Sequence, residues 1–331
     1  MVLQCFYRCI YTYENIITEK GVNMRNILKE NILKLKKEKN AIILAHLYEP
    51  DEIQEIADYV GDSYYLSKIA RDCQEELIIF CGVKFMGESA KILSPQKTVI
   101  LPAANAGCPM ADMADAEDLK EMIKDYPDAF KVCYINSSYE VKALCDVSVT
   151  SSSALDIIKN VPNKQILFLP DRNLGSYIAE FFPDKEFILW QGFCPTHERI
   201  NAEDILASKE KHPNVKVLAN PECNKEVRDL CDYIGSTSGI IDFANKCEDE
   251  EFIICTEEGI LYELEKNNPN KKFYFPEKIV CPNMKKTNLE NIYDALCGKV
   301  EEVVLDEEIA KKALTSLENM HKLKEMVLCG E

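Results

Sequence analysis

The chain repeats one order of hydrophobic and polar segments three times. Each third opens on a short apolar run: AIILA at 41–45, KVCYI at 131–135 and VKVLA at 215–219. A helical stretch, a second apolar run, another helix and a third apolar run then follow in each third. Apolar runs of this length that alternate with helical patterns predict βαβ units and a parallel sheet.

An aspartate and a group of hydroxyl residues recur at the same point of each third. Asp58, Asp146 and Asp232 close the first helical stretch, and each lies 22 residues before the end of the second apolar run. The hydroxyl residues that follow them are Ser63, Thr150, Ser151, Ser152, Ser236, Thr237 and Ser238. Since helices are predicted nearby, these residues are either ordinary N-caps or anion-binding groups at helix ends.

Cys-Pro pairs stand just after the third apolar run of each third and nowhere else in the chain. They begin at Cys108, Cys194 and Cys281, which lie 86 and 87 residues apart. Proline directly after such a residue suits the first turn of a helix. Ligands in parallel α/β sheets bind beyond the carboxyl ends of the strands. The even spacing therefore predicts that each repeat brings one cysteine to a shared site.

These patterns predict an α/β protein of three pseudo-threefold-related α/β/α units, with small parallel sheets around a central active-site cavity. The predicted units span residues 24–108, 109–194 and 195–281. A helical tail at 282–331 is expected to pack back on the first unit. Residues 1–23 differ from the rest and are predicted to be an N-terminal extension, with Met24 as an alternative start.

Composition and charge narrow the class of partner. The formal net charge of −17 argues against nucleic acid or an anionic membrane as a partner. The N-terminal stretch is interrupted by Arg8 and Glu14, so it does not fit a signal peptide or a membrane span. We expect a cytoplasmic protein, in which the 15 cysteines stay reduced. Because no C-x-x-C occurs, a metal site must draw its thiolates from distant segments.

Three converging thiolates favour a particular kind of metal chemistry. Structural zinc sites usually take four protein ligands, and a four-iron cluster normally takes four cysteines. With three cysteines, one iron keeps an open position and acts as a Lewis acid toward a hydroxyl or carboxylate. This interpretation predicts hydro-lyase-like or condensation chemistry rather than electron transfer. The alternative is that the cysteines are evenly spaced only because the structural repeat is, and that they bind no metal.

Further candidate side chains lie at the predicted strand ends. His46 and Tyr48 form an i, i+2 pair that points to one side of a strand, and Tyr134 and Asn136 form another. The remaining candidates are His197, three residues after Cys194, and Glu222, two residues after Asn220. The histidines are candidates for acid–base chemistry. A structural histidine and a solvated loop carboxylate are the alternatives.

The residues collected so far match a known family. The chain resembles the quinolinate synthases from about residue 41 to about residue 300. The resemblance is carried by long phrases in the right order, among them AHLYEPDEIQEIADYVGDS, NAGCPMADM, SSYEVKALCDVSVTSSSA, GFCPTHERI, NPECNKEVRDLCDYIGSTSGI and CPNMKKTNLE. So many ordered phrases make the resemblance specific.

The resemblance implies a fold, a cofactor and a reaction. It implies three α/β domains around a [4Fe–4S] cluster held by Cys108, Cys194 and Cys281. The implied reaction condenses iminoaspartate (iminosuccinate) with dihydroxyacetone phosphate to quinolinate, with loss of phosphate and water, in NAD biosynthesis. An aspartate-oxidising or aspartate dehydrogenase enzyme is the implied supplier of iminoaspartate.

The resemblance also implies roles for individual residues. The implied catalytic residues are His46, Tyr48, Glu222 and His197. The implied substrate-binding residues are His46, Ser63, Tyr134, Asn136, Ser151, Asn220, Glu222 and Thr237. One position departs from the family, which usually reads H-P-E where this chain reads Asn220-Pro221-Glu222. Asparagine forms hydrogen bonds but does not shuttle protons near neutral pH.

Two rival functions remain open at this point. A metal-free protein of the same fold would sense a phosphorylated or dicarboxylate metabolite, and Asn220 favours it. A zinc hydrolase would use Cys108, Cys194, Cys281 and His197 as ligands. The ordered cysteines speak against the metal-free protein, because binding alone needs no thiolates. Metal analysis separates the zinc enzyme from an iron–sulfur enzyme.

Overall fold

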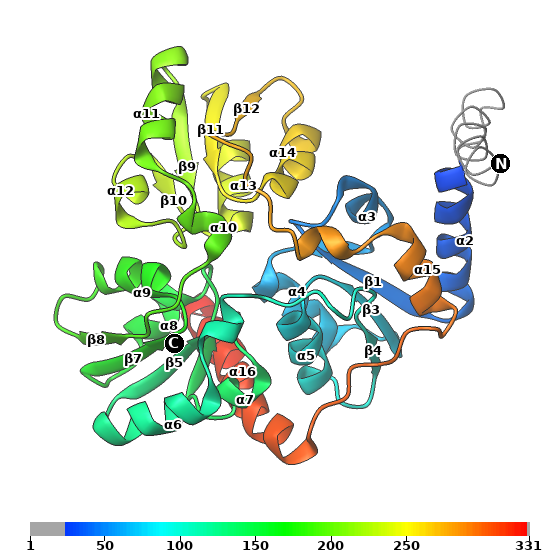
Figure 1. Cartoon of the computed structure of the whole chain (residues 1–331), viewed down its shortest axis with the longest axis horizontal. Helices are drawn as coiled ribbons and strands as arrows, with labels where there is room; N and C mark the ends of the chain where they lie inside the picture. The colour runs from blue at the N-terminus through cyan, green and yellow to red at the C-terminus, as the bar shows by residue number, and fades with distance from the viewer. Residues whose placement is uncertain (1–23, 330–331) are drawn as a thin grey trace, which may run out of the picture.

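A computed structural model describes residues 24–329 of the chain (Figure 1). In this part the strands form three four-stranded sheets, ordered β2-β1-β3-β4, β6-β5-β7-β8 and β10-β9-β11-β12, and all neighbouring strands are parallel. Helices alternate with the strands throughout. The predicted α/β class with three repeated α/β/α units is therefore confirmed. We name the units first, second and third by these sheets.

The strands are short, and most are buried. In the first unit they are β1 (Ala41–His46), β2 (Tyr59–Gly61), β3 (Leu77–Cys81) and β4 (Thr98–Ile100). In the second unit they are β5 (Phe130–Tyr134), β6 (Val147–Val149), β7 (Gln165–Leu169) and β8 (Glu186–Leu189). In the third unit they are β9 (Lys216–Ala219), β10 (Tyr233–Ile234), β11 (Glu251–Cys255) and β12 (Lys272–Tyr274). Their central strands are apolar because helices cover both faces of a parallel sheet.

The helices cover the sheets and connect the units. Those of the first unit are α2 (Met24–Glu38), α3 (Asp51–Ile56), α4 (Ser63–Asp72) and α5 (Lys84–Leu93). The second unit has η1 (Ala111–Met113), α6 (Ala116–Asp125), α7 (Tyr139–Lys142), α8 (Ala154–Lys159) and α9 (Arg172–Ala179). The third has α10 (Pro195–Glu198), α11 (Ala202–Lys211), α12 (Lys225–Arg228), α13 (Thr237–Lys246), η2 (Glu258–Ile260) and α14 (Leu261–Asn267). The tail forms η3 (Met284–Lys286), α15 (Leu289–Leu296) and α16 (Glu307–Cys329). None of the helices within residues 24–329 combines the length and apolar character that crossing a bilayer requires.

The recurring aspartate has a structural explanation. Asp146, just before β6, accepts a hydrogen bond from the Lys131 N–H of β5 at 2.8 Å, and its own N–H donates to the Lys131 carbonyl oxygen at 2.9 Å. The other units repeat both bonds, between Asp58 and Ile43 at 2.8 and 2.8 Å and between Asp232 and Val217 at 2.9 and 2.8 Å. The repeated aspartate thus connects the start of the edge strand (β2, β6 or β10) to the neighbouring strand of the same sheet (β1, β5 or β9).

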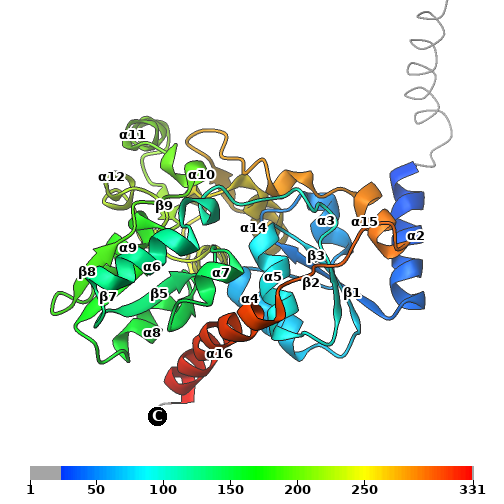
Figure 2. The same cartoon turned by 60° about the horizontal axis from the view of Figure 1, so that its bottom comes forward.

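The C-terminal tail reaches two of the three units. Helix α15 packs against α2 and β3 of the first unit. Helix α16 packs against α5 of the first unit and against α7, α8 and β6 of the second, and it lies across both in Figure 2. The Ser316 hydroxyl meets the Ser148 hydroxyl at 3.1 Å, and the Asn319 side chain donates to the Asp146 carbonyl oxygen at 2.8 Å. The tail therefore packs on both the first and the second unit.

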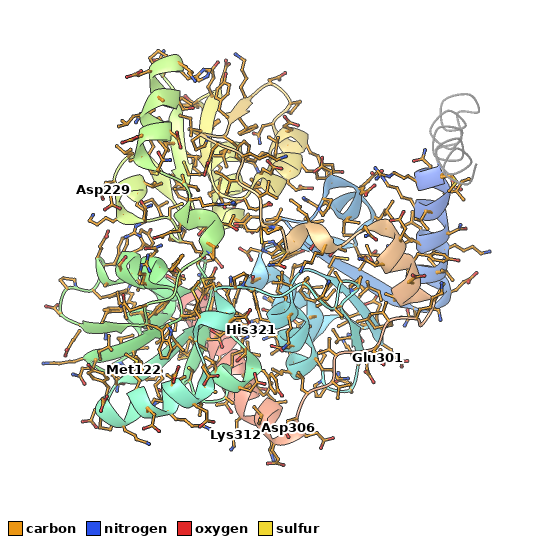
Figure 3. All side chains as sticks on the ribbon, in the orientation of Figure 1. Met122, Asp229, Glu301, Asp306, Lys312 and His321 are labelled. Carbon is orange, nitrogen blue, oxygen red and sulfur yellow. The ribbon has the colours of Figure 1, made fainter. Side chains whose placement is uncertain are left out.

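His321 is part of the inner face of α16 (Figure 3). Its side chain is buried, its Nε2 lies 3.3 Å from the Ser67 hydroxyl and its ring lies 5.3 Å from that of Tyr64. Burial, and the positive charge of Arg71, lower the pKa of His321 to about 4. The imidazole is thus held neutral where α16 meets α4.

We expect Asp146→Ala to lower the free energy of unfolding by about 1–3 kcal/mol, because the Lys131 N–H loses its partner. Urea unfolding followed by circular dichroism measures this change. Asp125→Ala, at the exposed end of α6, is the control and should leave the urea midpoint unchanged. Equal midpoints for the two variants would show that the repeated aspartate does not stabilise the sheet.

We also expect the folded state to lose stability as the pH falls from about 6.5 toward 4, in part through His321. The unfolded chain protonates this histidine near pH 6.5, whereas the folded chain does so only near 4. Between these values the contribution of His321 falls by up to about 1.4 kcal/mol per pH unit. His321→Gln should show a shallower slope of unfolding free energy against pH. An unchanged slope would contradict this role.

Candidate active site

One cavity of about 240 Å³ brings together residues from all three units. The predicted site residues on its wall are His46, Tyr48, Ser63, Cys108, Tyr134, Asn136, Ser151, Cys194, His197, Asn220, Glu222, Thr237 and Cys281. Of the seven hydroxyl residues named in the repeats, only Ser238 does not line the cavity. The strands of each sheet are parallel and end on the same edge, so residues at the ends of separate strands meet there.

The three cysteines occupy equivalent positions at the start of short helical turns. Cys194 is the N-cap of α10, and Pro195 is the first residue of that helix. Cys108 precedes η1, and Cys281 precedes η3. Burial raises the pKa of the Cys108 thiol to about 12, and burial also raises the pKa of Cys194 and Cys281. Three thiolates in this cavity therefore require a bound cation to offset their desolvation.

The spacing of these thiols limits the size of the group that they could hold. Their three sulfur atoms do not all lie within 4.8 Å of one another; among the described residues that condition is met by ligand atoms of Cys194, His197 and Glu222. One tetrahedral zinc ion holds its thiolates about 3.8 Å apart. Among the described residues, the three cysteines thus do not form a zinc-sized group, whereas Cys194, His197 and Glu222 do.

His46 ends β1 and is held as a neutral donor. Its Nδ1 accepts a hydrogen bond from the Tyr48 N–H at 3.1 Å. Burial lowers the pKa of His46 to about 3, although the nearby Glu222 opposes this shift. With Nδ1 accepting and the ring neutral, the single proton sits on Nε2. His46 can therefore donate one hydrogen bond through Nε2.

The Tyr48 hydroxyl is the meeting point of the first and third units. It lies 2.9 Å from the Thr237 hydroxyl and 2.7 Å from the Thr256 hydroxyl, and the Asn220 amide donates to it at 3.4 Å. Burial and the charge of Glu222 raise the pKa of Tyr48 well above its usual value. Asn220 also accepts from the Glu222 N–H at 3.0 Å through Oδ1. Asn220, which replaces the family's usual histidine, thus orients Tyr48 and Glu222 through hydrogen bonds.

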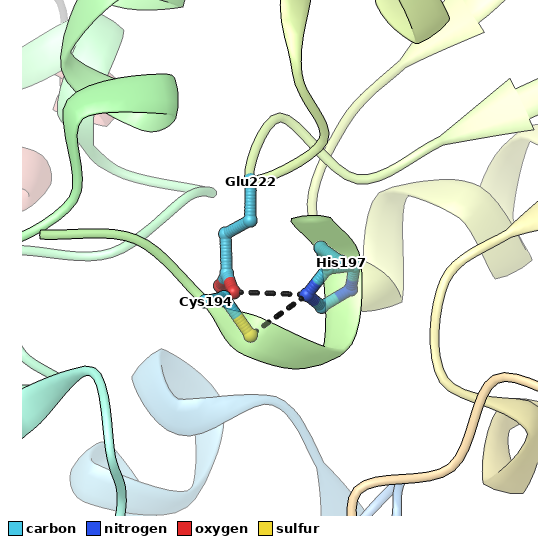
Figure 4. Close-up of side chains that lie close together, drawn as sticks. All are labelled: Cys194, His197 and Glu222. Atoms are coloured by element: carbon cyan, nitrogen blue, oxygen red, sulfur yellow. Dashed lines mark hydrogen bonds and ion pairs between the residues drawn. The ribbon is translucent and has the colours of Figure 1, made fainter. Parts of the chain in front are cut away.

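Glu222 is a buried carboxylate surrounded by donors (Figure 4). The His197 Nδ1 lies 3.0 Å from its Oε2 and 3.2 Å from the Cys194 sulfur, and the Tyr134 hydroxyl donates to its Oε1 at 2.5 Å. Burial alone would raise the pKa of Glu222. The charge of His197 and hydrogen bonds from His197, Tyr134 and Cys194 outweigh burial and lower that pKa. Glu222 is therefore ionised, and it can accept a proton only when this network changes.

The polar residues at the start of α4 and α13 cap these helices and line the cavity. Asp62 caps α4 by accepting from the Tyr65 N–H, and Ser236 caps α13 by accepting from the Gly239 N–H at 3.1 Å. Ser63 and Thr237, the first residues of those helices, line the cavity together with the two caps. The capping alternative is therefore confirmed for Ser236, and anion binding by its neighbours stays a prediction.

The second unit adds two more cavity groups. The Ser151 hydroxyl lies 3.2 Å from that of Tyr134. The side-chain oxygen of Asn136 is buried and has no hydrogen-bond partner within the described part of the chain. Both residues are polar groups of the cavity wall that a bound substrate could engage.

Sequence analysis missed two residues of this site. Thr256 is fully buried and joins the Tyr48 hydroxyl to the His197 Nε2, which lies 2.9 Å from its own hydroxyl. It directly follows β11, so its strand-end position was a signal that could have identified it. Arg199 is the one lysine or arginine among the described residues that line the cavity, and its guanidinium donates to the Val280 carbonyl oxygen at 3.0 Å. Its presence in GFCPTHERI, five residues after Cys194, was the corresponding signal.

Comparisons with known proteins agree with the resemblance seen in the sequence. The family described as "Quinolinate synthetase A protein" matches residues 30–322. A quinolinate synthase of Clostridioides difficile (strain 630) is 63% identical over 299 residues, which cover 90% of this chain and 98% of the relative. One from Clostridium perfringens (strain SM101 / Type A) is 60% identical over 297 residues, covering 89% and 99%. One from Caldicellulosiruptor bescii is 54% identical over 298 residues, covering 89% and 98%. The chain belongs to the quinolinate synthase family.

Proposed function

We propose that this chain is a cytoplasmic enzyme of NAD biosynthesis that condenses iminoaspartate with dihydroxyacetone phosphate to quinolinate, with loss of phosphate and water. The observation that carries the proposal is the wall of the cavity, where one cysteine from each repeat meets buried acid–base side chains. Metabolite sensing would need the polar groups but not three converging thiols. Membership of the quinolinate synthase family supports the same reaction.

A [4Fe–4S] cluster is the cofactor that fits this donor set. Cys108, Cys194 and Cys281 would hold it, because each repeat brings one cysteine to the cavity wall and the three do not form the compact group that one zinc ion needs. When bound, a cluster with three cysteine ligands supplies an open iron, a Lewis acid that promotes loss of water from a hydroxyl-bearing carbon. The same spacing weighs against the zinc hydrolase with Cys108, Cys194, Cys281 and His197 as ligands.

The protein's own side chains would bind the anionic substrates. Ser63 and Thr237 begin two helices of ten residues, whose N-termini favour phosphate and carboxylate groups. The unpartnered oxygen of Asn136 suits a substrate amine or hydroxyl donor. Arg199 supplies a fixed positive charge on the cavity wall. These groups let a protein of net charge −17 hold a dicarboxylate and a phosphate.

Proton transfer would be divided between two sets of residues. Glu222, ionised and paired with His197, is placed to take a proton from a substrate carbon or nitrogen. His46, neutral with its proton on Nε2, is placed to donate a hydrogen bond to a substrate oxygen. Tyr48 keeps its phenol proton and orients the substrate beside it. Asn220 forms hydrogen bonds but does not transfer protons. Any proton transfer that a histidine would perform at position 220 is therefore carried out by Glu222 or His46.

The chemistry of iminoaspartate implies a partner activity. An imine of this kind hydrolyses in water, so it must be produced close to where it is consumed. An aspartate-oxidising enzyme or an aspartate dehydrogenase would supply it.

Iron and acid-labile sulfide analysis of anaerobically purified protein tests the cluster directly. We expect about four of each per chain in the wild type, and loss of both in Cys194→Ala. Cys297→Ala is the matched control, since this exposed cysteine lies outside the cavity and should leave the content unchanged. A wild-type protein that takes up neither iron nor sulfide after anaerobic reconstitution would contradict the proposed cofactor.

Thr256→Val should lower quinolinate formation, because it leaves the Tyr48 hydroxyl and the His197 Nε2 without their shared partner. A loss of about 1–3 kcal/mol corresponds to a kcat/KM that is about 5- to 150-fold lower. Thr256→Ser keeps the hydroxyl and should recover most of the activity. Ser94→Ala, which removes a buried hydroxyl far from the cavity, is the control and should keep full kcat/KM. Equal losses in the valine and serine variants would show that the hydroxyl is not what matters.

A further inference from the structure

Cys194, His197 and Glu222 form a second ligand set within the cavity (Figure 4). One sulfur, one imidazole nitrogen and one carboxylate oxygen from these residues all lie within 4.8 Å of one another. The His197 Nδ1 lies 3.2 Å from the Cys194 sulfur and 3.0 Å from the Glu222 Oε2. Within residues 24–329 this is the one group of three such side chains that is so compact.

The geometry of this set is close to that of a tetrahedral zinc site. With Zn–S near 2.3 Å and Zn–N and Zn–O near 2.1 Å, a tetrahedral ion separates sulfur from nitrogen by about 3.6 Å and nitrogen from oxygen by about 3.4 Å. The observed distances of 3.2 and 3.0 Å are each shorter by a few tenths of an ångström. Each of these two ligand pairs would therefore have to separate by only about 0.4 Å to take up the ion.

The surroundings also suit a zinc ion with an open position. His197 and Glu222 are buried, and Cys194 is half-buried, so the first three ligands are shielded from water. All three residues line the cavity, so the fourth ligand can be a water molecule on that side. The Thr256 hydroxyl holds the other ring nitrogen of His197 at 2.9 Å and fixes the orientation of the ring.

We propose that the chain without its cluster binds one zinc ion at Cys194, His197 and Glu222, and that zinc bound there blocks cluster assembly. As the Zn–S and Zn–N bonds form, the thiol proton of Cys194 and the Nδ1 proton of His197 leave to the buffer. Cys194 cannot then serve a cluster, whereas Cys108 and Cys281 remain unused. A site with one sulfur, one nitrogen and one oxygen ligand favours Zn²⁺ over Fe²⁺. The blocking of assembly rests on the proposed cluster; the zinc site itself does not.

Zinc titration of the full chain, stripped of iron and kept anaerobic, tests the site. A chromophoric chelator competes for the metal and reports the affinity. We expect one zinc ion per wild-type chain, and affinities at least tenfold weaker in His197→Ala and Glu222→Gln. Cys108→Ala and Cys281→Ala are the matched controls, and their affinities should stay within about threefold of the wild type. Circular dichroism of each variant excludes misfolding as the cause of a loss.

The opposite pattern would overturn the proposal. If Cys108→Ala and Cys281→Ala lose zinc while His197→Ala keeps it, the ion sits among the three thiolates. The absorption spectrum of the wild-type chain with cobalt(II) in place of zinc is a second test, which needs no variant. Its charge-transfer absorption increases with the number of thiolate ligands. The wild-type spectrum should show one cobalt–thiolate bond, and a spectrum typical of three would contradict the site.

Reconstitution with iron and sulfide tests the second half of the proposal. Wild-type chain loaded with one zinc ion should take up far less iron and sulfide than zinc-free chain, and a chelator should restore the uptake. Full uptake in the presence of bound zinc would overturn the block. A zinc-free wild type that takes up no iron would instead contradict the proposed cluster. The zinc site would still be tested separately, by the zinc titration.

Discussion

Parallel strands in one sheet end on the same edge, and the whole site depends on this constraint. Each sheet has the strand order 2-1-3-4, so the ends of its first and third strands lie side by side. His46 is the last residue of β1, Asn220 directly follows β9, and Thr256 directly follows β11. Three such edges face one cavity, and residues from all three units meet there. The hydrogen bond between Tyr48 and Thr256 spans 208 positions of the chain as a result.

Burial sets the protonation of this cavity more than net charge does. It keeps His46 neutral, raises the pKa of the cysteine thiols, and keeps Tyr48 a phenol. Glu222 is the exception, because three donors around it offset the cost of desolvation. The cavity therefore holds a buried anion, which favours a positively charged neighbour such as His197.

Two lysines, one half-buried and one buried, hold loops that carry residues of the cavity. The Lys285 ammonium donates to the Tyr48 carbonyl oxygen at 2.5 Å and lies 3.0 Å from the Glu257 Oε1. The same carboxylate oxygen accepts from the Cys281 N–H at 3.0 Å. The backbone of one cysteine and the loop after β1 are therefore held by one ion pair. Lys142, fully buried, similarly donates to the Ser137 carbonyl oxygen in the loop that follows Tyr134. Such charges remain stable only because each has a partner.

The sequence by itself determined the repeat, the parallel sheets and the residues that could meet. Apolar periodicity is a local property, and strand-end positions such as His46 and Cys194 follow from it. Tertiary structure decided the contacts. It placed His197 between Cys194 and Glu222, identified Thr256 and Arg199, assigned the repeated aspartate to the sheet edge, and carried α16 onto the second unit. These features depend on distances between side chains far apart in the chain, and local pattern carries no information about such distances.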